Sequence, residues 1–225
     1  AQRSARSSAV PAKTAKPKPI IRAVTFNVQR LSEIPRRPLN WLWYPRLPLG
    51  KLCGLSGNPS DGKTTIALDI SSRVSTGANW PDGGDNEPGT ICYVTAEDDI
   101  ADTILPRLVA CGADLDRVLT FNQSGRTFDD GEVIQSLFDL NADADNLGEL
   151  MKAAPDLRLL VLDPVSAFMG TRIDSNQNSH VRSVLAKLAD FAQQHQVCVL
   201  MINHLNKNGD TRAMYRTSGS LAYVA

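Results

Sequence analysis

Eight residues in the first third of the chain have the types and spacing of a phosphate-binding loop. Gly57 to Thr64 read GNPSDGKT and match the pattern G-x-x-x-x-G-K-[ST]. In such a loop the glycines let backbone N–H groups face a pyrophosphate, a lysine reaches the β- and γ-phosphates, and a hydroxyl binds Mg²⁺. The pattern predicts nucleotide binding by Gly57, Asn58, Pro59, Ser60, Asp61, Gly62, Lys63, Thr64 and Thr65, with Thr64 on the metal.

The residues around this loop predict the elements that it requires. Residues 51–56 (KLCGLS) have the pattern of a short buried strand, and residues 64–75 have that of a helix. Strand, loop and helix therefore come in the order that a phosphate-binding loop needs, because the loop must lead into a helix N-terminus, where a bound anion is favoured. The competing interpretation is a Gly/Pro-rich turn that precedes a helix by chance, and the flanking elements make it the weaker one.

Three later apolar runs each end in polar side chains. Residues 159–162 (LLVL) precede Asp163, residues 93–96 precede Glu97, and residues 199–202 precede Asn203 and His204. Ligands bind beyond the carboxyl ends of parallel strands, so we expect these side chains beside the phosphate loop. Asp163 is predicted to hold Mg²⁺ through water.

Glu97 and His204 have the chemistry that ATP hydrolysis needs. A carboxylate at the end of the neighbouring strand can orient water against the γ-phosphate, whereas Asp98 and Asp99 are expected to begin the next helix. Helix capping is also the competing role for Glu97. His204 fits a γ-phosphate sensor with Asn203 as its neighbour, and a purely structural histidine is the alternative.

The segment 205–220 (LNKNGDTRAMYRTSGS) is polar and carries three cations, Lys207, Arg212 and Arg216. It is predicted either to meet single-stranded nucleic acid in a central channel or to insert an arginine into a neighbouring subunit's ATP site. An ordinary solvated loop is an equal alternative. Residues 170–180 are a second candidate for a channel loop.

Apolar runs alternate with amphipathic stretches along the body of the chain, which predicts an α/β fold with a predominantly parallel, twisted sheet flanked by helices. Residues 75–87 are rich in turn formers and should be a surface loop. The aromatic residues at 41–44 are expected to anchor the entry strand to the core, with contact to a base or a subunit as the alternative. Strands are predicted at 52–56, 90–95, 117–121, 159–163 and 197–202, and helices at 63–75, 100–111, 145–154 and 180–195.

The charge distribution divides the chain into a basic arm and an acidic body. Residues 1–37 contain nine Lys and Arg and one acid, which leaves fifteen cations and twenty-three acids in residues 38–225. An acidic body excludes a general nucleic-acid surface, so any DNA contact should be local. The arm is predicted to be a flexible linker, and residues 38–225 a single ATPase domain.

No run of residues is apolar and long enough to span a membrane or to serve as a secretory signal, so a cytoplasmic protein is expected. The four cysteines are scattered and are expected to be buried free thiols. The chain begins without Met and stops within an apolar run, which suggests a longer parent protein.

The order of these motifs resembles the RecA-like P-loop ATPases, in particular the RepA-type hexameric replicative helicases of plasmids, phages and mobile elements, with an ATPase domain of the AAA_25 type. The resemblance covers about residues 39–225. Its residues are those at 41–51, GNPSDGKTT at 57–65, YVTAEDD at 93–99, LLVLDP at 159–164, INHLNK at 202–207 and RTSGSLAYVA at 216–225.

The resemblance implies ATP and Mg²⁺ as cofactors, with Glu97 as catalytic base, Asp163 on the metal and His204 as γ-phosphate sensor. It implies that Arg216 or Arg212 acts on the neighbouring subunit. A primase-like domain could precede the ATPase in the parent. The loop differs from the family at Asp61, whose carboxylate should weaken nucleotide binding unless it points to solvent.

The resulting hypothesis is an ATP-hydrolysing motor that forms a hexameric ring and acts on single-stranded DNA as a helicase. One alternative is a recombinase-like or regulatory ATPase that switches its assembly without unwinding DNA. Another is an ATP-binding scaffold with weak or no catalysis.

Overall fold

A computed structural model of the chain describes residues 26–121, 123–127, 132–169 and 178–205. Contacts between Cα atoms divide the chain into two units, Ala1–Pro38 and Leu39–Ala225. In the first unit the described residues contain one 3-10 turn, Leu31–Glu33, and their side chains are exposed. The second unit contains the sheet and every residue of the predicted site that the structure describes.

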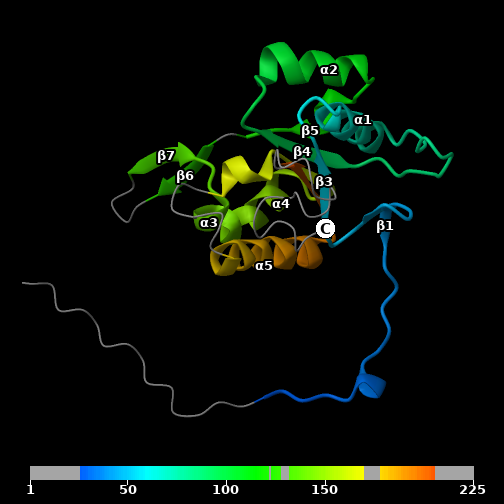
Figure 1. The fold of residues 1–225 in the computed structure, drawn as a ribbon, viewed down its shortest axis with the longest axis vertical. Coiled ribbons are helices and arrows are strands. Elements are labelled where there is room, and N and C mark those ends of the chain that lie inside the picture. The colour runs from blue at the N-terminus through cyan, green and yellow to red at the C-terminus, as the bar shows by residue number, and fades with distance from the viewer. Residues whose placement is uncertain (1–25, 122, 128–131, 170–177, 206–225) are drawn as a thin grey trace, which may run out of the picture. The chain divides into compact units, whose positions relative to one another are not determined.

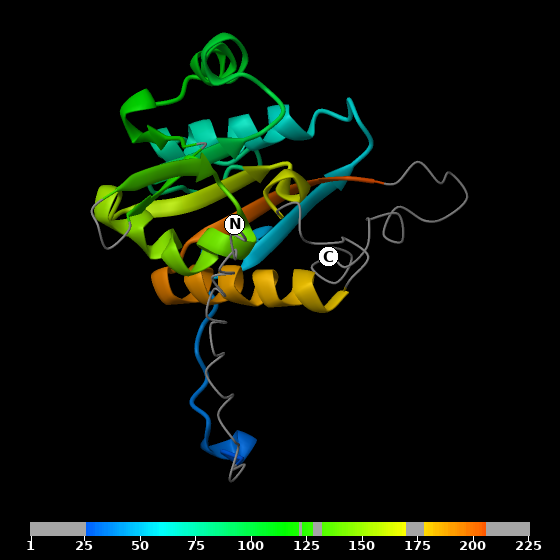
Figure 2. The same cartoon turned by 90° about the vertical axis from the view of Figure 1, so that its left-hand side faces the viewer.

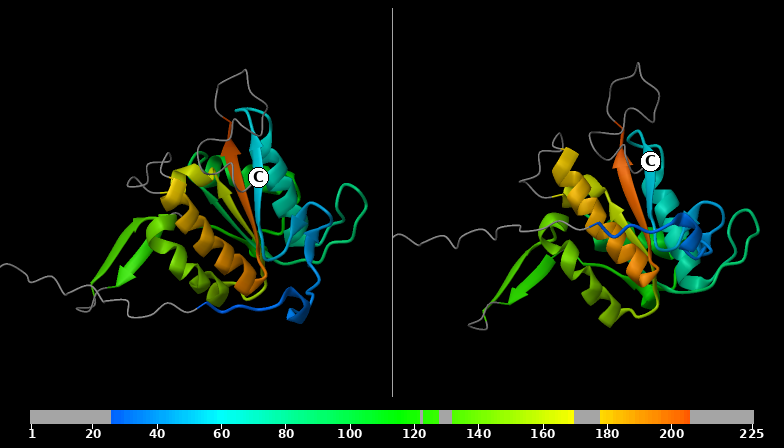
Figure 3. Two further views of the ribbon diagram at one scale, coloured as in Figure 1. Left: turned by 60° about the horizontal axis from the view of Figure 1, so that its bottom comes forward. Right: turned by 90° about the horizontal axis from the view of Figure 1, so that it is seen from below.

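A parallel sheet of five strands forms the centre of the second unit (Figure 1). In spatial order it contains β3 (Leu52–Gly57), β9 (Cys198–His204), β8 (Leu157–Asp163), β4 (Thr90–Thr95) and β5 (Val118–Leu119). The register places Gly57 opposite His204 and Thr95 opposite Asp163. The carboxyl ends of four neighbouring strands therefore lie at one edge, and Figure 3 shows β3 and β9 ending side by side.

Helices cover both faces of this sheet, as Figures 1 and 2 show. One face carries α1 (Lys63–Thr76), a π-helical turn at Ile100–Ile104 and α2 (Leu105–Ala110). The other carries α5 (Asn178–His195) and three short elements, α3 (Leu140–Asp143), a 3-10 segment at Ala144–Glu149 and α4 (Leu150–Ala153). The architecture is the predicted α/β fold with a parallel sheet between helices.

The alternation of side chains along each strand decides which face a residue serves. Ile91 and Tyr93 of β4 pack with α1, and so do Leu159 and Val161 of β8. Their alternate neighbours, such as Cys92, pack with α5. Because Asp163 continues the β8 alternation by two residues, it lies on the α1 face.

Two antiparallel hairpins were not predicted from the sequence. The first pairs β1 (Trp41–Trp43) with β2 (Leu47–Pro48), and the second pairs β6 (Gln123–Thr127) with β7 (Val133–Leu137). The first hairpin is attached to the core as expected, because Leu42 is buried and the Trp43 ring stacks on Trp80 with 4.8 Å between ring centroids. Trp43 also donates to the carboxylate of Asp82 in the following loop.

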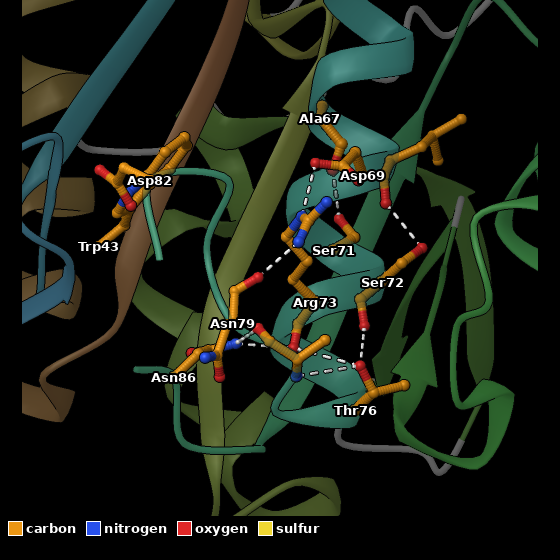
Figure 4. A network of polar contacts seen from close by, with 12 residues as sticks. Trp43, Ala67, Asp69, Ser71, Ser72, Arg73, Thr76, Asn79, Asp82 and Asn86 are labelled. Carbon is orange, nitrogen blue, oxygen red and sulfur yellow. Dashed lines mark hydrogen bonds and ion pairs between the residues drawn. The ribbon is translucent and has the colours of Figure 1, made fainter. Parts of the chain in front are cut away.

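The carboxyl end of α1 is capped by a network of polar contacts, shown in Figure 4. The helix ends at Gly77, whose positive φ of 75° suits glycine and whose N–H donates to the Arg73 carbonyl at 2.8 Å. Asn86 donates to the same carbonyl at 2.7 Å, and Arg73 itself bonds the Asp69 carboxylate at 2.8 Å. The loop that follows is thereby tied to the last turn of the helix.

Several predicted elements differ from the observed ones. β3 is an edge strand and only partly buried, because it pairs with β9 alone. The helix expected at 100–111 begins with a π-helical turn, and the one expected at 145–154 is a 3-10 segment followed by a short helix. All four cysteines are free, but Cys111 is exposed and Cys53 is half-buried, so the expectation of four buried thiols was wrong for these two.

Candidate nucleotide site

The phosphate loop joins β3 to α1 at the carboxyl-terminal edge of the sheet. Gly62 has φ of +81°, a left-handed conformation that favours glycine, and it caps α1 without a side-chain hydrogen bond. No acidic residue occupies the first turn of α1. In contrast to the closed carboxyl end of the helix, its amino end has N–H groups directed toward the loop, where an anion is favoured.

Lys63 is folded back onto the loop in this structure. Its side chain is 6% exposed, and Nζ donates to the carbonyls of Asn58 at 2.7 Å and Gly57 at 3.1 Å. Gly57 leaves room for both side chains, because a Cβ here would lie 3.0 Å from the Asp61 carboxylate and 3.3 Å from Cδ of Lys63 and would require them to shift. The ammonium group is held where the loop would surround a phosphate.

Asp61 turns its carboxylate back toward the loop backbone. Oδ2 accepts a hydrogen bond from the Asn58 N–H at 2.6 Å, and the Asp61 N–H donates to the Asn58 carbonyl at 3.2 Å. The carboxylate thus bridges the turn, although the residue as a whole is exposed. Its negative charge lies within the segment predicted to bind phosphates.

Asp163 meets Thr64 across the gap between β8 and α1. The Thr64 hydroxyl donates to Asp163 Oδ2 at 3.0 Å, and the Tyr93 hydroxyl donates to the same oxygen at 2.7 Å. Asp163 is 3% exposed, and burial raises the pKa of its carboxyl; the hydrogen bonds from Tyr93 and Thr64 oppose this rise, and the charges of Glu97 and Asp98 add to it.

The pair formed by Thr64 and Asp163 fits Mg²⁺. A hydroxyl and a carboxylate oxygen are the hard ligands that this ion takes, and it commonly uses only one or two protein groups together with substrate phosphates. No cluster of three or more His, Cys, Asp and Glu that could hold a metal occurs among the described residues. The arrangement therefore suits a metal that is shared with a nucleotide better than a site made by protein side chains alone.

Glu97 and His204 lie in contact beside this pair. Nε2 of His204 is 3.2 Å from Oε1 and 3.3 Å from Oε2 of Glu97. Carboxylate oxygens accept hydrogen bonds, so Nε2 is assigned as the donor in this contact. Nδ1 of His204 is buried and has no hydrogen-bond partner among the described residues. Asn203 is buried, and its Nδ2 also has no partner in the described part of the chain.

The three acids after β4 have separate positions. Asp99 caps the following π-helical turn by accepting from the N–H groups of Ala101 and Asp102. Asp98 lies 3.3 Å from Arg107 of α2. Glu97 accepts from His204 and makes no capping bond in the described structure, so its geometry agrees with a role at the site rather than with the competing capping role.

The structure thus brings together Lys63, Thr64, Glu97, Asp163 and His204, as the strand-end pattern predicts. The Tyr93 hydroxyl was missed. A signal for it existed, because Tyr93 is the only aromatic residue in the strand run at 90–95 and is two residues from the strand end. Lys207, Arg212, Arg216 and most of the loop at 170–180 lie outside the described residues.

Comparison with protein families gives a match over most of the chain. Residues 16–210 match the model of the AAA_25 family, described as an AAA domain. The chain belongs to this family. Its members are RecA-like P-loop ATPases, and the central parallel sheet flanked by helices has the corresponding fold.

The chain is also similar to curated DNA repair proteins named RadA. The relative from Streptococcus pneumoniae is 26% identical over 212 residues, which cover 92% of this chain and 42% of the relative. The relative from Chlamydia trachomatis is 26% identical over 163 residues, covering 72% of this chain and 29% of that protein. The chain therefore spans less than half the length of these relatives.

None of the helices in the described residues is long and apolar enough to cross a membrane.

Proposed function

We propose that the chain hydrolyses ATP with Mg²⁺ and uses the reaction to act on DNA. The observation that supports this most is the convergence of two contacts at one edge of the sheet: Thr64 with Asp163 at 3.0 Å, and Glu97 with His204 at 3.2 Å. Together with the phosphate loop they comprise a metal-binding pair, a general base and a polar sensor, which are the parts that phosphoryl transfer requires.

Each side chain has a distinct task in this proposal. The loop N–H groups and Lys63 bind the phosphates, which requires Lys63 to leave the carbonyls of Gly57 and Asn58. When bound, Mg²⁺ neutralises charge on the phosphate oxygens, and Thr64 and Asp163 would hold it. Glu97 orients a water molecule and accepts its proton.

His204 supplies the link between the nucleotide and the base. In this structure its Nε2 lies 3.2 Å from Oε1 of Glu97, so the proposed sensor and the proposed base share a hydrogen bond. A γ-phosphate offers the same N–H a more highly charged acceptor. The exchange would release Glu97 for water and report the presence of ATP to the residues after β9.

For the biological role we propose a DNA helicase that forms a hexameric ring in the cytoplasm and contacts single-stranded DNA through local cationic segments. The support is the motif order shared with ring-forming RecA-like ATPases and the cations Lys207, Arg212 and Arg216. The acidic balance of residues 38–225 argues for local DNA contacts rather than a broad basic surface.

A recombination or repair ATPase that does not unwind DNA is the second candidate. The similarity to the DNA repair protein RadA over 92% of the chain favours it. In this case nucleotide binding would switch an assembly on DNA, and the same five site residues would bind and hydrolyse ATP.

Phosphate release measured with and without single-stranded DNA tests the proposed reaction. We expect ATP hydrolysis by the wild-type chain, stimulation by DNA, and loss of hydrolysis in Lys63→Ala. Lys187→Ala is the matched control, because Lys187 pairs with Asp145 and belongs to α5, which covers the face of the sheet opposite α1. An assembled wild type that hydrolyses no ATP would contradict the proposal.

Electron microscopy with a non-hydrolysable ATP analogue separates the two candidates. Closed rings together with strand separation of a forked duplex are expected for the helicase. Open filaments on DNA without strand separation would favour the recombination or repair ATPase.

A further inference from the structure

Tyr93 is a buried ionisable residue to which the proposed reaction assigns no task. Its side chain is fully enclosed (0% exposed) in the core between the sheet and α1. A tyrosine hydroxyl in such a place needs a partner, since burying it without one destabilises the folded chain. Its partner is the Asp163 carboxylate, 2.7 Å away.

The direction of this bond is determined by chemistry. A phenol carries an O–H that can donate, and a carboxylate oxygen accepts, so Tyr93 is the donor and Asp163 the acceptor. The acceptor is Oδ2 of Asp163, the same oxygen that accepts from Thr64 at 3.0 Å. One carboxylate oxygen is thus held by two hydroxyls from two different elements, β4 and α1.

The two hydroxyls differ in freedom. Thr64 is partly exposed in the first turn of α1, next to the loop that would change on nucleotide binding. Tyr93 is fixed by its ring, which is packed in the core and cannot move without disturbing β4 and its neighbours. Tyr93 is therefore the partner that determines where the Asp163 carboxylate points.

We propose that Tyr93 is a positioning residue for the magnesium site. Its hydroxyl fixes the Asp163 carboxylate in the orientation that faces Thr64, so that both oxygens are in place before the metal arrives. The inference rests on the proposed function, which gives Thr64 and Asp163 their role in holding Mg²⁺. Hydrogen-bond partners of this kind typically contribute about 10-fold to 100-fold to metal affinity.

Tyr93→Phe isolates the hydroxyl, because the ring and its packing remain. The chain offers a matched control on the same strand: the hydroxyl of Thr90 donates to the Asp156 carboxylate, also at 2.7 Å, at the opposite edge of the sheet. Thr90→Val removes a hydroxyl-to-carboxylate bond of the same length from β4 without touching the site.

The test measures how strongly the purified chain binds a fluorescent methylanthraniloyl ATP in EDTA and across a series of MgCl₂ concentrations. We expect Tyr93→Phe to need about 10-fold more Mg²⁺ than the wild type for half of the metal-dependent gain in affinity. Its affinity in EDTA should equal that of the wild type. Thr90→Val should match the wild type in both conditions.

Three results would overturn the inference: an unchanged Mg²⁺ requirement in Tyr93→Phe, an equal loss of affinity with and without Mg²⁺, or the same shift in Thr90→Val. A wild type whose nucleotide affinity does not respond to Mg²⁺ would instead contradict the proposed function itself, and the positioning role would fall with it. Circular dichroism checks folding, and Tyr93→Met, which also lacks the hydroxyl but fills core space, replaces Tyr93→Phe if that variant does not fold.

Discussion

Carboxylates at the two edges of the parallel sheet have different partners: cations at the amino-terminal edge and hydroxyl groups at the carboxyl-terminal edge. At the amino-terminal edge, Asp156 lies 3.3 Å from Arg117, and Glu87 lies 3.3 Å from Arg158. At the carboxyl-terminal edge, Asp163 is buried and has two hydroxyl donors but no cation within ion-pair distance among the described residues.

Strand β4 shows the contrast most directly, because it makes a hydroxyl-to-carboxylate bond of 2.7 Å at each edge. The acceptor at one edge, Asp156, is exposed and paired with a cation, whereas the acceptor at the other, Asp163, is buried near the charges of Glu97 and Asp98. The hydrogen bond itself therefore does not distinguish the amino-terminal edge, which we call structural, from the carboxyl-terminal edge, which we call functional. The two edges differ in negative charge that no cation compensates, because such charge lowers the stability of the fold unless a cation binds there.

The largest expected effect is on the rate of ATP hydrolysis, and it should differ between Glu97 and its neighbour Asp98 at the functional edge. Glu97→Gln should lower the rate of ATP hydrolysis about 100-fold or more, because it removes the proposed proton acceptor while keeping the side-chain shape. Asp98→Asn is the control, since Asp98 pairs with Arg107 away from His204. Phosphate-release assays at saturating ATP measure both. Equal losses in the two variants would contradict the role given to Glu97.

A second effect is on the free energy of unfolding: replacing the carboxylate should raise it at the functional edge (Asp163) and lower it slightly at the amino-terminal edge (Asp156). Burial raises the pKa of Asp163, so folding disfavours its charged form, and this cost is present above the ordinary aspartate pKa of about 4. Asp163→Asn should therefore stabilise the chain by about 1 kcal/mol at pH 7. Urea unfolding without nucleotide or Mg²⁺ measures it. A destabilised variant would show that the carboxylate is compensated after all.

Asp61 is expected to give a smaller effect at the functional edge. Its carboxylate accepts from the Asn58 N–H within the phosphate loop, so its charge should repel a bound triphosphate. Asp61→Asn keeps an acceptor oxygen and removes the charge, and it should tighten ATP binding a few-fold, less at high salt. Titration calorimetry at two salt concentrations measures this. Weaker binding would mean that the charge is needed to hold the loop in shape.

The smallest effect belongs to the amino-terminal edge. Asp156→Asn should destabilise the chain by only about 0.5 kcal/mol, because the Arg117 pair is exposed and screened by solvent. Nucleotide affinity should not change. The same urea and binding measurements apply, and a change in ATP affinity would remove the proposed distinction between the edges.

Much of the fold and site was predictable because local patterns and sheet geometry agree. β4 was predicted with its observed bounds of Thr90–Thr95, and the polar residues at the carboxyl ends of three strands lie close together, as expected for parallel strands. The hairpin of β6 and β7 was missed, because the β6 sequence is polar and the β7 side chains are mostly exposed, so neither segment has the apolar pattern that predicts a strand. The edge position of β3 was also missed, since strand order depends on pairing between distant segments.

The sequence by itself determined the phosphate loop, the alternation of strands and helices, and the residue types at the strand ends, because spacing and hydrophobic period are local properties of the chain. Only the tertiary structure decided which of those residues touch. It formed the hydrogen bonds between Tyr93 and Asp163, between the Asn58 N–H and Asp61, and between His204 and Glu97. The register between strands far apart in sequence decides two of these contacts and the path of the loop decides the third, and neither appears in any single segment.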